Sequence, residues 1–320
     1  MKRFTIIVFL FLSTFVWSIP GHAQIHKQKL FVKWEKLNAE VVSLHKQGRY
    51  DRAVEVAKKA LKIAEEKGGL NHPTVALSLN NLALVYKSQG RYEQAEKLYM
   101  FSLTLGEVAR GPNHPSVATC LNNLAALYLT QGRFEEAETY YKRALTIKEK
   151  ALGSEHLSVA LSLNNLAELY RLQGRYTLAE PSCKRALVIR EKKLGPDHPA
   201  VATSLNNLAE LYRIQGRYTQ AEPLYRRALT IRETTFGPAH PKAVESLNNF
   251  AVFYRNQGRY TEAEPLYERL LKIRERILAP DHPAIAATLE NLAAIYRKTD
   301  RSQTAKTYEE RAAAIRAIKP

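Results

Sequence analysis

The feature that most constrains this fold is a repeat with a constant period of 42 residues. Histidines recur at this interval without slippage: His72, His114, His156, His198, His240 and His282. Glycines recur in the same way: Gly48, Gly90, Gly132, Gly174, Gly216 and Gly258. A fixed period of about 20 to 50 residues is typical of solenoids, in which each repeat packs only against its neighbours.

One repeat, residues 198–239, predicts two helices. Apolar residues of the first, helix A, stand at i, i+4, i+7 and i+11, which is one helical face: Val201, Leu205, Leu208 and Tyr212. We expect Gly216 to end helix A, and Thr219 with Glu222 to form a capping box that opens helix B. Pro223 is then expected in the first turn, where it costs little. The apolar stripe of helix B contains six residues: Ala221, Leu224, Tyr225, Ala228, Leu229 and Ile231.

The repeat ends in a breaker, Gly237-Pro238-Ala239-His240-Pro241, so each unit is a helical hairpin. The spacing of the small and aromatic residues resembles the tetratricopeptide repeat: Leu208-Ala209-x-x-Tyr212, Gly216, Ala221, Tyr225 and Ala228. The phrases LNNLAELYRIQGRY, AEPLYRRALTIRE and GPDHP, with the longer period, resemble the kinesin-light-chain type. The resemblance covers roughly residues 30–318. It implies an all-α, right-handed superhelical solenoid of about seven helix-turn-helix hairpins.

The N-terminus predicts a secretory signal peptide over residues 1–23. Lys2 and Arg3 precede an apolar run over 4–19, and Gly21 and Ala23 provide the small residues before the cleavage point. A retained membrane anchor is the alternative, but about 16 apolar residues fall short of the roughly 20 that cross a bilayer. We therefore expect a periplasmic or secreted protein. Cleavage would remove Lys2 and Arg3 and lower the formal net charge from +17 to +15.

The remaining chain divides into repeats. Residues 24–68 form a divergent N-terminal hairpin, 69–281 five units of 42 residues, and 282–320 a C-terminal unit with a capping helix. The two cysteines, Cys120 and Cys183, lie 63 residues apart on different helix types, which disfavours a disulfide. We interpret both as small buried hydrophobic residues.

No catalytic or metal-binding motif stands out from the repeats. HExxH, GxSxG, GxxxxGK[ST] and CxxC are absent. Each repeated histidine precedes a different helix A. Equivalent residues in successive repeats are two helices apart, so two of these histidines lie too far from each other to bind one zinc ion. We interpret these histidines as helix-start residues. We predict no catalytic residue, no metal and no cofactor, which favours a protein that is not an enzyme.

The second asparagine of each repeat is a candidate for peptide binding because a carboxamide both donates and accepts hydrogen bonds. These residues are Asn81, Asn123, Asn165, Asn207, Asn249 and Asn291. In the kinesin-light-chain type, helix A lines the concave surface, and asparagines at these positions hold short acidic peptides with the help of nearby basic residues. The resemblance implies the same here. Alternatively, the asparagines satisfy backbone groups within the solenoid.

A second set of candidates is basic: Arg171, Arg213, Arg255 and Arg297. The alternative interpretation is a solvated salt-bridge face, since Glu168 and Glu210 stand three residues before the first two arginines. Val252 and Ala294 take that place before Arg255 and Arg297. We therefore expect the most anion-selective part of the groove between the fifth and seventh hairpins.

The charge on helix B is expected on the convex, solvated side, as in Arg226-Arg227, Arg232-Glu233 and Arg274-Glu275. The working hypothesis is a scaffold that binds an extended, acidic peptide segment of a partner protein. Two alternatives stay open: binding of a polyanion or an envelope surface, and self-assembly through apolar residues such as Met100 and Phe101. The export signal and the absence of a reading module disfavour nucleic acid. The oligomeric state is left open.

Overall fold

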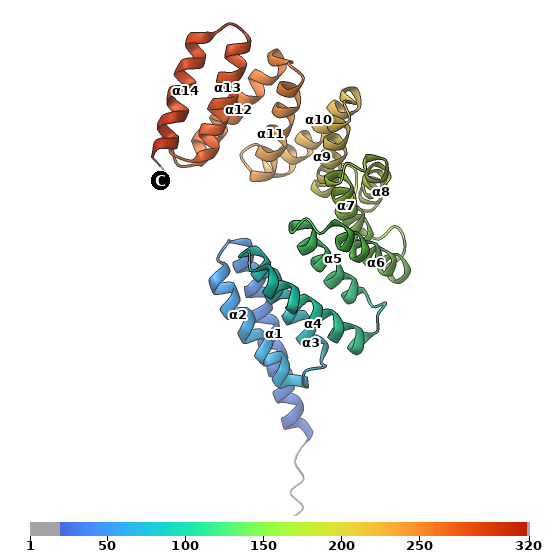
Figure 1. The fold of residues 1–320 in the computed structure, drawn as a ribbon. Helices are drawn as coiled ribbons and strands as arrows, with labels where there is room; N and C mark the ends of the chain where they lie inside the picture. Colours follow the sequence, from blue (N-terminus) through green and yellow to red (C-terminus); the bar gives the residue numbers. More distant parts are fainter. Residues whose placement is uncertain (1–19, 319–320) are drawn as a thin grey trace, which may run out of the picture. The chain divides into compact units, whose positions relative to one another are not determined.

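The computed structural model describes residues 20–318, which form fourteen α-helices and no strand (Figure 1). The helices are α1 (Pro20–Lys46), α2 (Tyr50–Gly68), α3 (Pro73–Ser88), α4 (Tyr92–Arg110), α5 (Pro115–Thr130), α6 (Phe134–Leu152), α7 (Leu157–Leu172), α8 (Tyr176–Leu194), α9 (Pro199–Ile214), α10 (Tyr218–Phe236), α11 (Pro241–Asn256), α12 (Tyr260–Ile277), α13 (Pro283–Lys298) and α14 (Ser302–Ala317). Most of the predicted signal peptide lies outside the described residues. None of the described helices combines the length and apolar character that crossing a membrane requires.

The helices pair into seven hairpins, because each odd-numbered helix packs against the even-numbered helix that follows it. The chain divides into two compact units, which we call unit 1 (residues up to Pro112) and unit 2 (from Asn113). Unit 1 contains α1–α4, and unit 2 contains α5–α14. Within unit 2, α7 also packs against α5 and α9, so these first helices of successive hairpins lie side by side. The all-α solenoid of about seven hairpins predicted from the sequence is confirmed.

Each helix A from α3 onward begins at one of the repeated histidines. The Nδ1 atom of His198, for example, accepts a hydrogen bond of 3.1 Å from the backbone N–H of Ala200. The same N-cap contact occurs at the other five histidines. It satisfies one of the backbone donors that a helix start leaves unpaired. The interpretation of these histidines as helix-start residues is confirmed.

The predicted role of Gly216 is also confirmed. Its φ of 71° lies in the left-handed region that glycine tolerates best. Its N–H donates to the Arg213 carbonyl at 3.1 Å, and the Arg217 N–H donates to the Tyr212 carbonyl at 2.9 Å. These two bonds form a Schellman motif, which satisfies the last carbonyls of helix A.

The predicted start of helix B is wrong. Because the Schellman turn takes only a few residues, α10 already begins at Tyr218, with Arg217 at the N-cap and no side-chain hydrogen bond that caps it. Thr219 therefore lies inside the helix, and Pro223, its sixth residue, lies in the second turn and not the first. Glu222 does not complete a capping box but accepts hydrogen bonds from the next hairpin.

The core follows the predicted stripes. Between α9 and α10, Val201, Leu205, Ala228 and Ile231 form a buried cluster with Leu224 packed against it. Equivalent residues repeat in the other hairpins of unit 2. Cys120 and Cys183 are buried and form no disulfide, as predicted, and burial raises the pKa of the Cys183 thiol to about 12.

Candidate binding cavity

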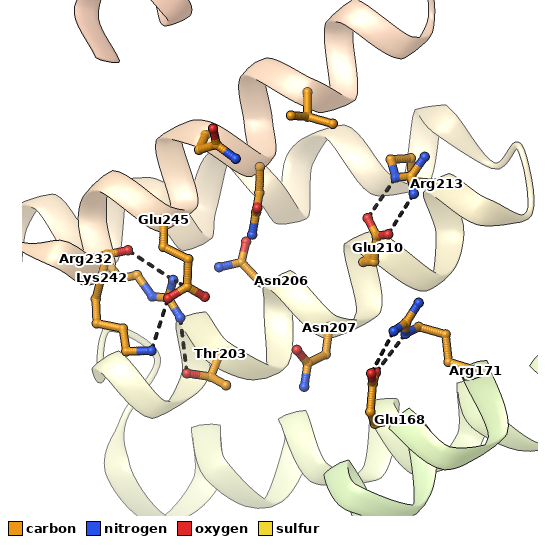
Figure 2. Close-up of a pocket in the computed structure, with 13 residues that line it drawn as sticks. Glu168, Arg171, Thr203, Asn206, Asn207, Glu210, Arg213, Arg232, Lys242 and Glu245 are labelled. Carbon is orange, nitrogen blue, oxygen red and sulfur yellow. Dashed lines mark hydrogen bonds and ion pairs between the residues drawn. The ribbon is translucent and has the colours of Figure 1, made fainter. Parts of the chain in front are cut away.

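A cavity of about 470 Å³ lies in unit 2, along α7, α9 and α11, with one contribution from α10 (Figure 2). Its lining residues are Glu168, Arg171, Thr203, Asn206, Asn207, Glu210, Arg213, Arg232, Lys242, Glu245, Asn248, Asn249 and Val252. The cavity brings together four of the predicted site residues: Arg171, Asn207, Arg213 and Asn249. It lies in the fourth to sixth hairpins, one repeat before the place expected from the arginine pattern.

The six predicted asparagines are all half-buried on helix A, but their environments differ. In unit 1, the amide of Asn81 donates to the Asn38 side chain at 2.8 Å. In unit 2, Asn291 accepts a hydrogen bond from Arg255. Asn165, Asn207 and Asn249 have no hydrogen-bond partner within residues 20–318. Of these, Asn207 (Figure 2) and Asn249 line the cavity. These two carboxamides are therefore available to a ligand.

Arg171 and Arg213 are held by ion pairs, as the salt-bridge interpretation predicts. Nε and Nη2 of Arg171 donate to the Glu168 carboxylate at 2.7 and 2.6 Å. The same atoms of Arg213 donate to Glu210 at 2.7 Å each. Because both pairs use Nε and Nη2, the Nη1 donors of each arginine are left over for another acceptor.

Glu210 also accepts a hydrogen bond of 2.8 Å from the hydroxyl of Tyr225 on α10. Burial alone favours the neutral acid, but the hydrogen bonds from Arg213 and Tyr225 outweigh it and lower the pKa of Glu210. The Glu210 carboxylate thus stays charged, with both its side-chain partners on its own hairpin.

The other two predicted arginines differ from each other. Arg297 donates to the Glu309 carboxylate on α14 through two bonds of 2.6 Å. The expectation that Arg297 lacks a carboxylate partner is therefore wrong, because helix B supplies one. Arg255 instead donates to the neutral side chains of Asn256, at 3.0 Å, and Asn291. No carboxylate within the described chain pairs with Arg255.

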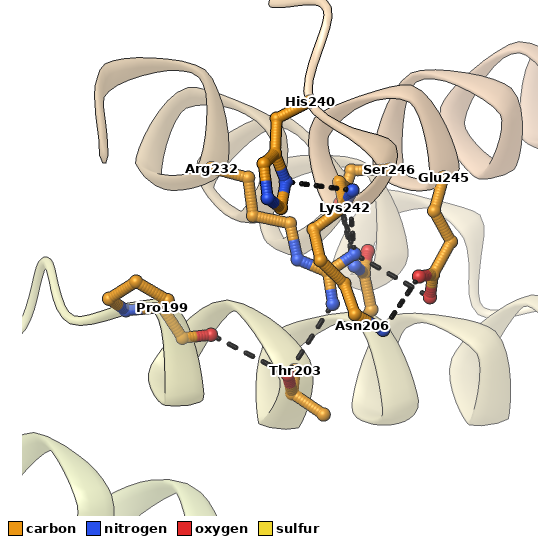
Figure 3. Close-up of polar contacts among 8 residues, drawn as sticks. All are labelled: Pro199, Thr203, Asn206, Arg232, His240, Lys242, Glu245 and Ser246. Carbon is orange, nitrogen blue, oxygen red and sulfur yellow. Dashed lines mark hydrogen bonds and ion pairs between the residues drawn. The ribbon is translucent and has the colours of Figure 1, made fainter. Parts of the chain in front are cut away.

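The prediction that Arg232 lies on a solvated convex surface is wrong. Arg232 is 2% exposed and reaches from α10 toward α11 (Figure 3). Its Nη1 donates to the Lys242 carbonyl at 3.1 Å and to the Ser246 hydroxyl at 2.9 Å. Its Nη2 lies 3.4 Å from the Thr203 hydroxyl, and Glu245 lies 3.6 Å from the guanidinium. Burial lowers the pKa of Arg232, and the charge of Glu245 opposes that shift.

The cations at the same position in three other hairpins of unit 2 are also buried or half-buried. Lys148 and Arg190 are buried and donate to Ser162 and Ser204. Arg274 is half-buried and donates to Thr288 at 2.6 Å, so it is not a solvated residue either. The signal was present in the sequence, because Arg232 stands four residues after Ala228 and seven after Tyr225, in the apolar stripe of helix B.

The first asparagine of each pair has a structural role in the same contacts. Asn206 is buried and donates to the Ser246 hydroxyl of the next hairpin at 2.8 Å, while its Oδ1 atom is buried without a partner. Asn122 donates to Ser162 in the same way at 3.1 Å. These asparagines join neighbouring hairpins, which distinguishes them from the half-exposed second asparagines.

Within residues 20–318, no three His, Cys, Asp or Glu side chains gather into a group that could hold a metal ion. These residues form helical repeats, and the first helices of three successive hairpins line a polar cavity. A family model for the tetratricopeptide repeat matches residues 38–100, 74–150, 158–234 and 242–317. The chain belongs to the tetratricopeptide repeat family. Tetratricopeptide repeat proteins typically act as scaffolds for protein–protein interaction and are generally not enzymes.

Solved tetratricopeptide repeat structures resemble this chain over most of their own length. BtubC (BKLC) from P. vanneervenii is 25% identical, with a TM-score of 0.63 over 72% of this chain and 91% of that chain. A putative kinesin light chain from Podosopora anserina, with nearly identical TPR-like repeats, is 29% identical, with a TM-score of 0.59 over 64% and 97%. These neighbours confirm the resemblance to the kinesin-light-chain type.

A more distant structure shares the fold alone. Aspartyl phosphate phosphatase F from Bacillus subtilis is 13% identical, with a TM-score of 0.63 over 91% of this tetratricopeptide repeat chain and 72% of that chain. No curated protein matches the chain.

Proposed function

We propose that this protein is a non-enzymatic scaffold that binds an extended, acidic segment of a partner protein along α7, α9 and α11. One observation carries the proposal: the carboxamides of Asn207 and Asn249 have no partner within the described residues and line a polar cavity. Side-chain amides on successive helices match the alternating donors and acceptors of an extended backbone.

The charges around the cavity support an acidic ligand. The lining contains four cations, Arg171, Arg213, Arg232 and Lys242, and three carboxylates, Glu168, Glu210 and Glu245, which leaves one positive charge in excess. Arg171 and Arg213 retain free Nη1 donors beside their ion pairs. Complementary charge of this kind favours fast association and selects between partners more than it raises affinity.

The test is binding of a mixed library of acidic and basic peptides to the purified chain. A double variant, Asn207→Ala with Asn249→Ala, removes the carboxamides, and a quadruple variant changes Arg171, Arg213, Arg255 and Arg297 to serine. Arg226→Ser is the control, since that side chain is 63% exposed on α10 and lies outside the cavity lining. We expect particular acidic peptides to bind the parent and the control, and to lose about tenfold or more in affinity in the double and in the quadruple variant.

Two other outcomes would replace this proposal. The formal net charge of +17 favours polyanion binding as the second candidate. Binding of every polyanion alike, with a steep dependence on salt and none on peptide sequence, would support it. A molecular mass that rises with protein concentration in light scattering, with no peptide bound, would favour self-assembly.

Export stays a prediction. It is supported by the basic and apolar N-terminal sequence, and N-terminal sequencing of the protein from its native cell tests it. A mature chain that begins at Gln24 is the expected result, and an intact Met1 would indicate a retained segment.

A further inference from the structure

The hairpins α9–α10 and α11–α12 differ at one position that matters for anion binding. In the first, the Glu210 carboxylate accepts hydrogen bonds from Arg213 and from the Tyr225 hydroxyl. The second hairpin has the corresponding arginine and tyrosine, Arg255 and Tyr267, but Val252 takes the place of the glutamate. Two donors are therefore present without the acceptor that the preceding repeat provides.

Neither donor has a carboxylate partner among the described residues. The Tyr267 hydroxyl is buried and has no hydrogen-bond partner, which is costly for a polar group in a protein interior. Burial raises the pKa of Tyr267, and the positive charges of Arg255 and Arg274 oppose the rise, so these cations act on the hydroxyl. Arg255 itself is held only by the neutral oxygens of Asn256 and Asn291.

Arg255 is the exception among the four predicted arginines. Arg171, Arg213 and Arg297 each have a bidentate carboxylate partner, respectively Glu168, Glu210 and Glu309. A ligand carboxylate must compete with an internal one at each of those three. At Arg255 it meets a guanidinium whose charge no carboxylate of the described chain neutralises.

The position of Arg255 also suits a ligand in the cavity. Val252 lines the cavity from α11, together with Asn249 one turn earlier. Arg255 follows Val252 by three residues on the same half-exposed helical face. A segment bound to Asn249 thus reaches Arg255 less than two helical turns further along α11.

We propose that a side-chain carboxylate of the bound segment pairs with Arg255, at the place that Glu210 fills in the preceding hairpin. This subsite rests on the proposed function and makes Arg255 its main determinant of acidic specificity. The chain supplies the template itself, because the Glu210–Arg213–Tyr225 triad shows which group completes the site.

The experiment restores the missing acceptor. Val252→Glu is expected to pair with Arg255 and accept from Tyr267, so it removes the free cation while every arginine stays in place. Val252→Gln has the same size without the charge. We expect V252E to unfold at a higher urea concentration than V252Q, and to bind a library-selected acidic peptide at least tenfold more weakly than V252Q does.

A second comparison uses the arginines. Arg255→Ser is expected to weaken the same peptide about tenfold or more, whereas Arg213→Ser with Glu210→Gln, which removes a paired arginine together with its partner, should weaken it by a smaller factor. Circular dichroism shows whether each variant is folded.

The outcomes separate the two proposals. If the parent binds no acidic peptide, both are wrong. If the parent binds but R255S has no larger effect than the paired double variant, or V252E binds as well as V252Q, the groove stands and the Arg255 subsite is wrong. Equal urea stability of V252E and V252Q would also overturn the subsite, since it would show that a carboxylate gains nothing there.

Discussion

Unit 1 and unit 2 share the 42-residue pattern, but their hairpins are joined by different chemistry. In unit 1, the Trp34 indole N–H donates to the Ser78 hydroxyl at 2.8 Å, and Ala64 and Gly106 stand where the repeats of unit 2 have a cation. In unit 2, the equivalent serines accept hydrogen bonds from buried cations, as Ser246 does from Arg232. We call the three buried cations Lys148, Arg190 and Arg232 the cation seam.

A second kind of contact joins neighbouring hairpins within unit 2, and the described residues show no such contact between the two hairpins of unit 1. The arginine of the Gly-Arg-Tyr turn, or Arg301 at the same position of the last repeat, pairs with a glutamate on helix B of the preceding hairpin. There are four such clasps: Arg175–Glu138, Arg217–Glu180, Arg259–Glu222 and Arg301–Glu264. Val54 takes the place of that glutamate in α2, the helix B that precedes the second hairpin of unit 1. Apolar residues therefore define each hairpin, whereas a few polar positions decide how neighbouring hairpins are joined.

The largest expected effect comes from breaking the cation seam. Arg232→Ala leaves the Ser246 hydroxyl and the Lys242 carbonyl without their buried donor and opens a void, which should cost about 3 kcal/mol of unfolding free energy. Trp34→Phe, the equivalent loss in unit 1, should cost only about 1 kcal/mol. Urea unfolding followed by circular dichroism measures both, and equal losses would contradict the proposed difference.

The clasps should come next. The hydrogen bond from Arg217 lowers the pKa of Glu180 to about 2, against the opposing effect of burial. Since the folded-state pKa is depressed, the stabilisation is present above pH 4.5 and is lost as pH falls toward 2. Glu180→Gln should cost about 2 kcal/mol at pH 7 and almost nothing at pH 2.

The matched control for this clasp is Glu55→Gln in unit 1. Glu55 is 60% exposed and pairs only with Arg52 of its own helix, so no measurable change is expected. A pH-independent loss in E180Q would show that shape, and not charge, holds the clasp.

Lys148 should show that burying a cation in the seam also destabilises the folded protein. Burial lowers the pKa of this amine to about 8, whereas the unfolded chain has the ordinary value near 10.5. Lys148→Met should therefore stabilise the protein by about 1–2 kcal/mol at pH 7. The Ser162 hydroxyl would lose the bond from Lys148 but keep the one that Asn122 donates. The gain should shrink as pH rises from 8 to 10.5, where the folded wild type can release its proton first. A gain that does not depend on pH would contradict the burial of a charged amine.

The smallest effect concerns the last turn of unit 2. Asp300 has a φ of 59°, in the position that glycine takes in the other repeats. Asp300→Gly should stabilise the protein by about 0.5–1 kcal/mol by removing backbone strain, as a shift in thermal unfolding would show. A lower Tm in the variant would mean that the aspartate side chain compensates for its own conformation.

The sequence was sufficient for the hairpins because their apolar stripes, histidine starts and glycine ends are local signals. Val201, Leu205, Gly216 and His240 do what their positions predict. The capping box at Thr219 failed because the Schellman bonds of Gly216 and Arg217 fix the start of helix B before any side chain can cap it.

The candidate site was predictable only in part. Helix A was the right element, and Asn207, Asn249, Arg171 and Arg213 do meet in one cavity. The partners of the arginines depend on contacts between helices, so the Glu309 carboxylate that pairs with Arg297 could not be read from the spacing along α13. Arg232 is buried because its position in the apolar stripe of helix B, and not its charge, decides where its side chain lies.

The clasps all run in one direction along the array, from each arginine to the preceding hairpin. This affects how the array could change length during evolution. Each hairpin of unit 2 from α7 onward contributes an arginine to the neighbour before it, and each from α5 to α12 a glutamate to the neighbour after it. Duplication or loss of one complete 42-residue repeat keeps every such charge matched. An insertion inside a helix that carries one of these residues would turn it away from its partner, whereas a change by whole repeats keeps the clasps.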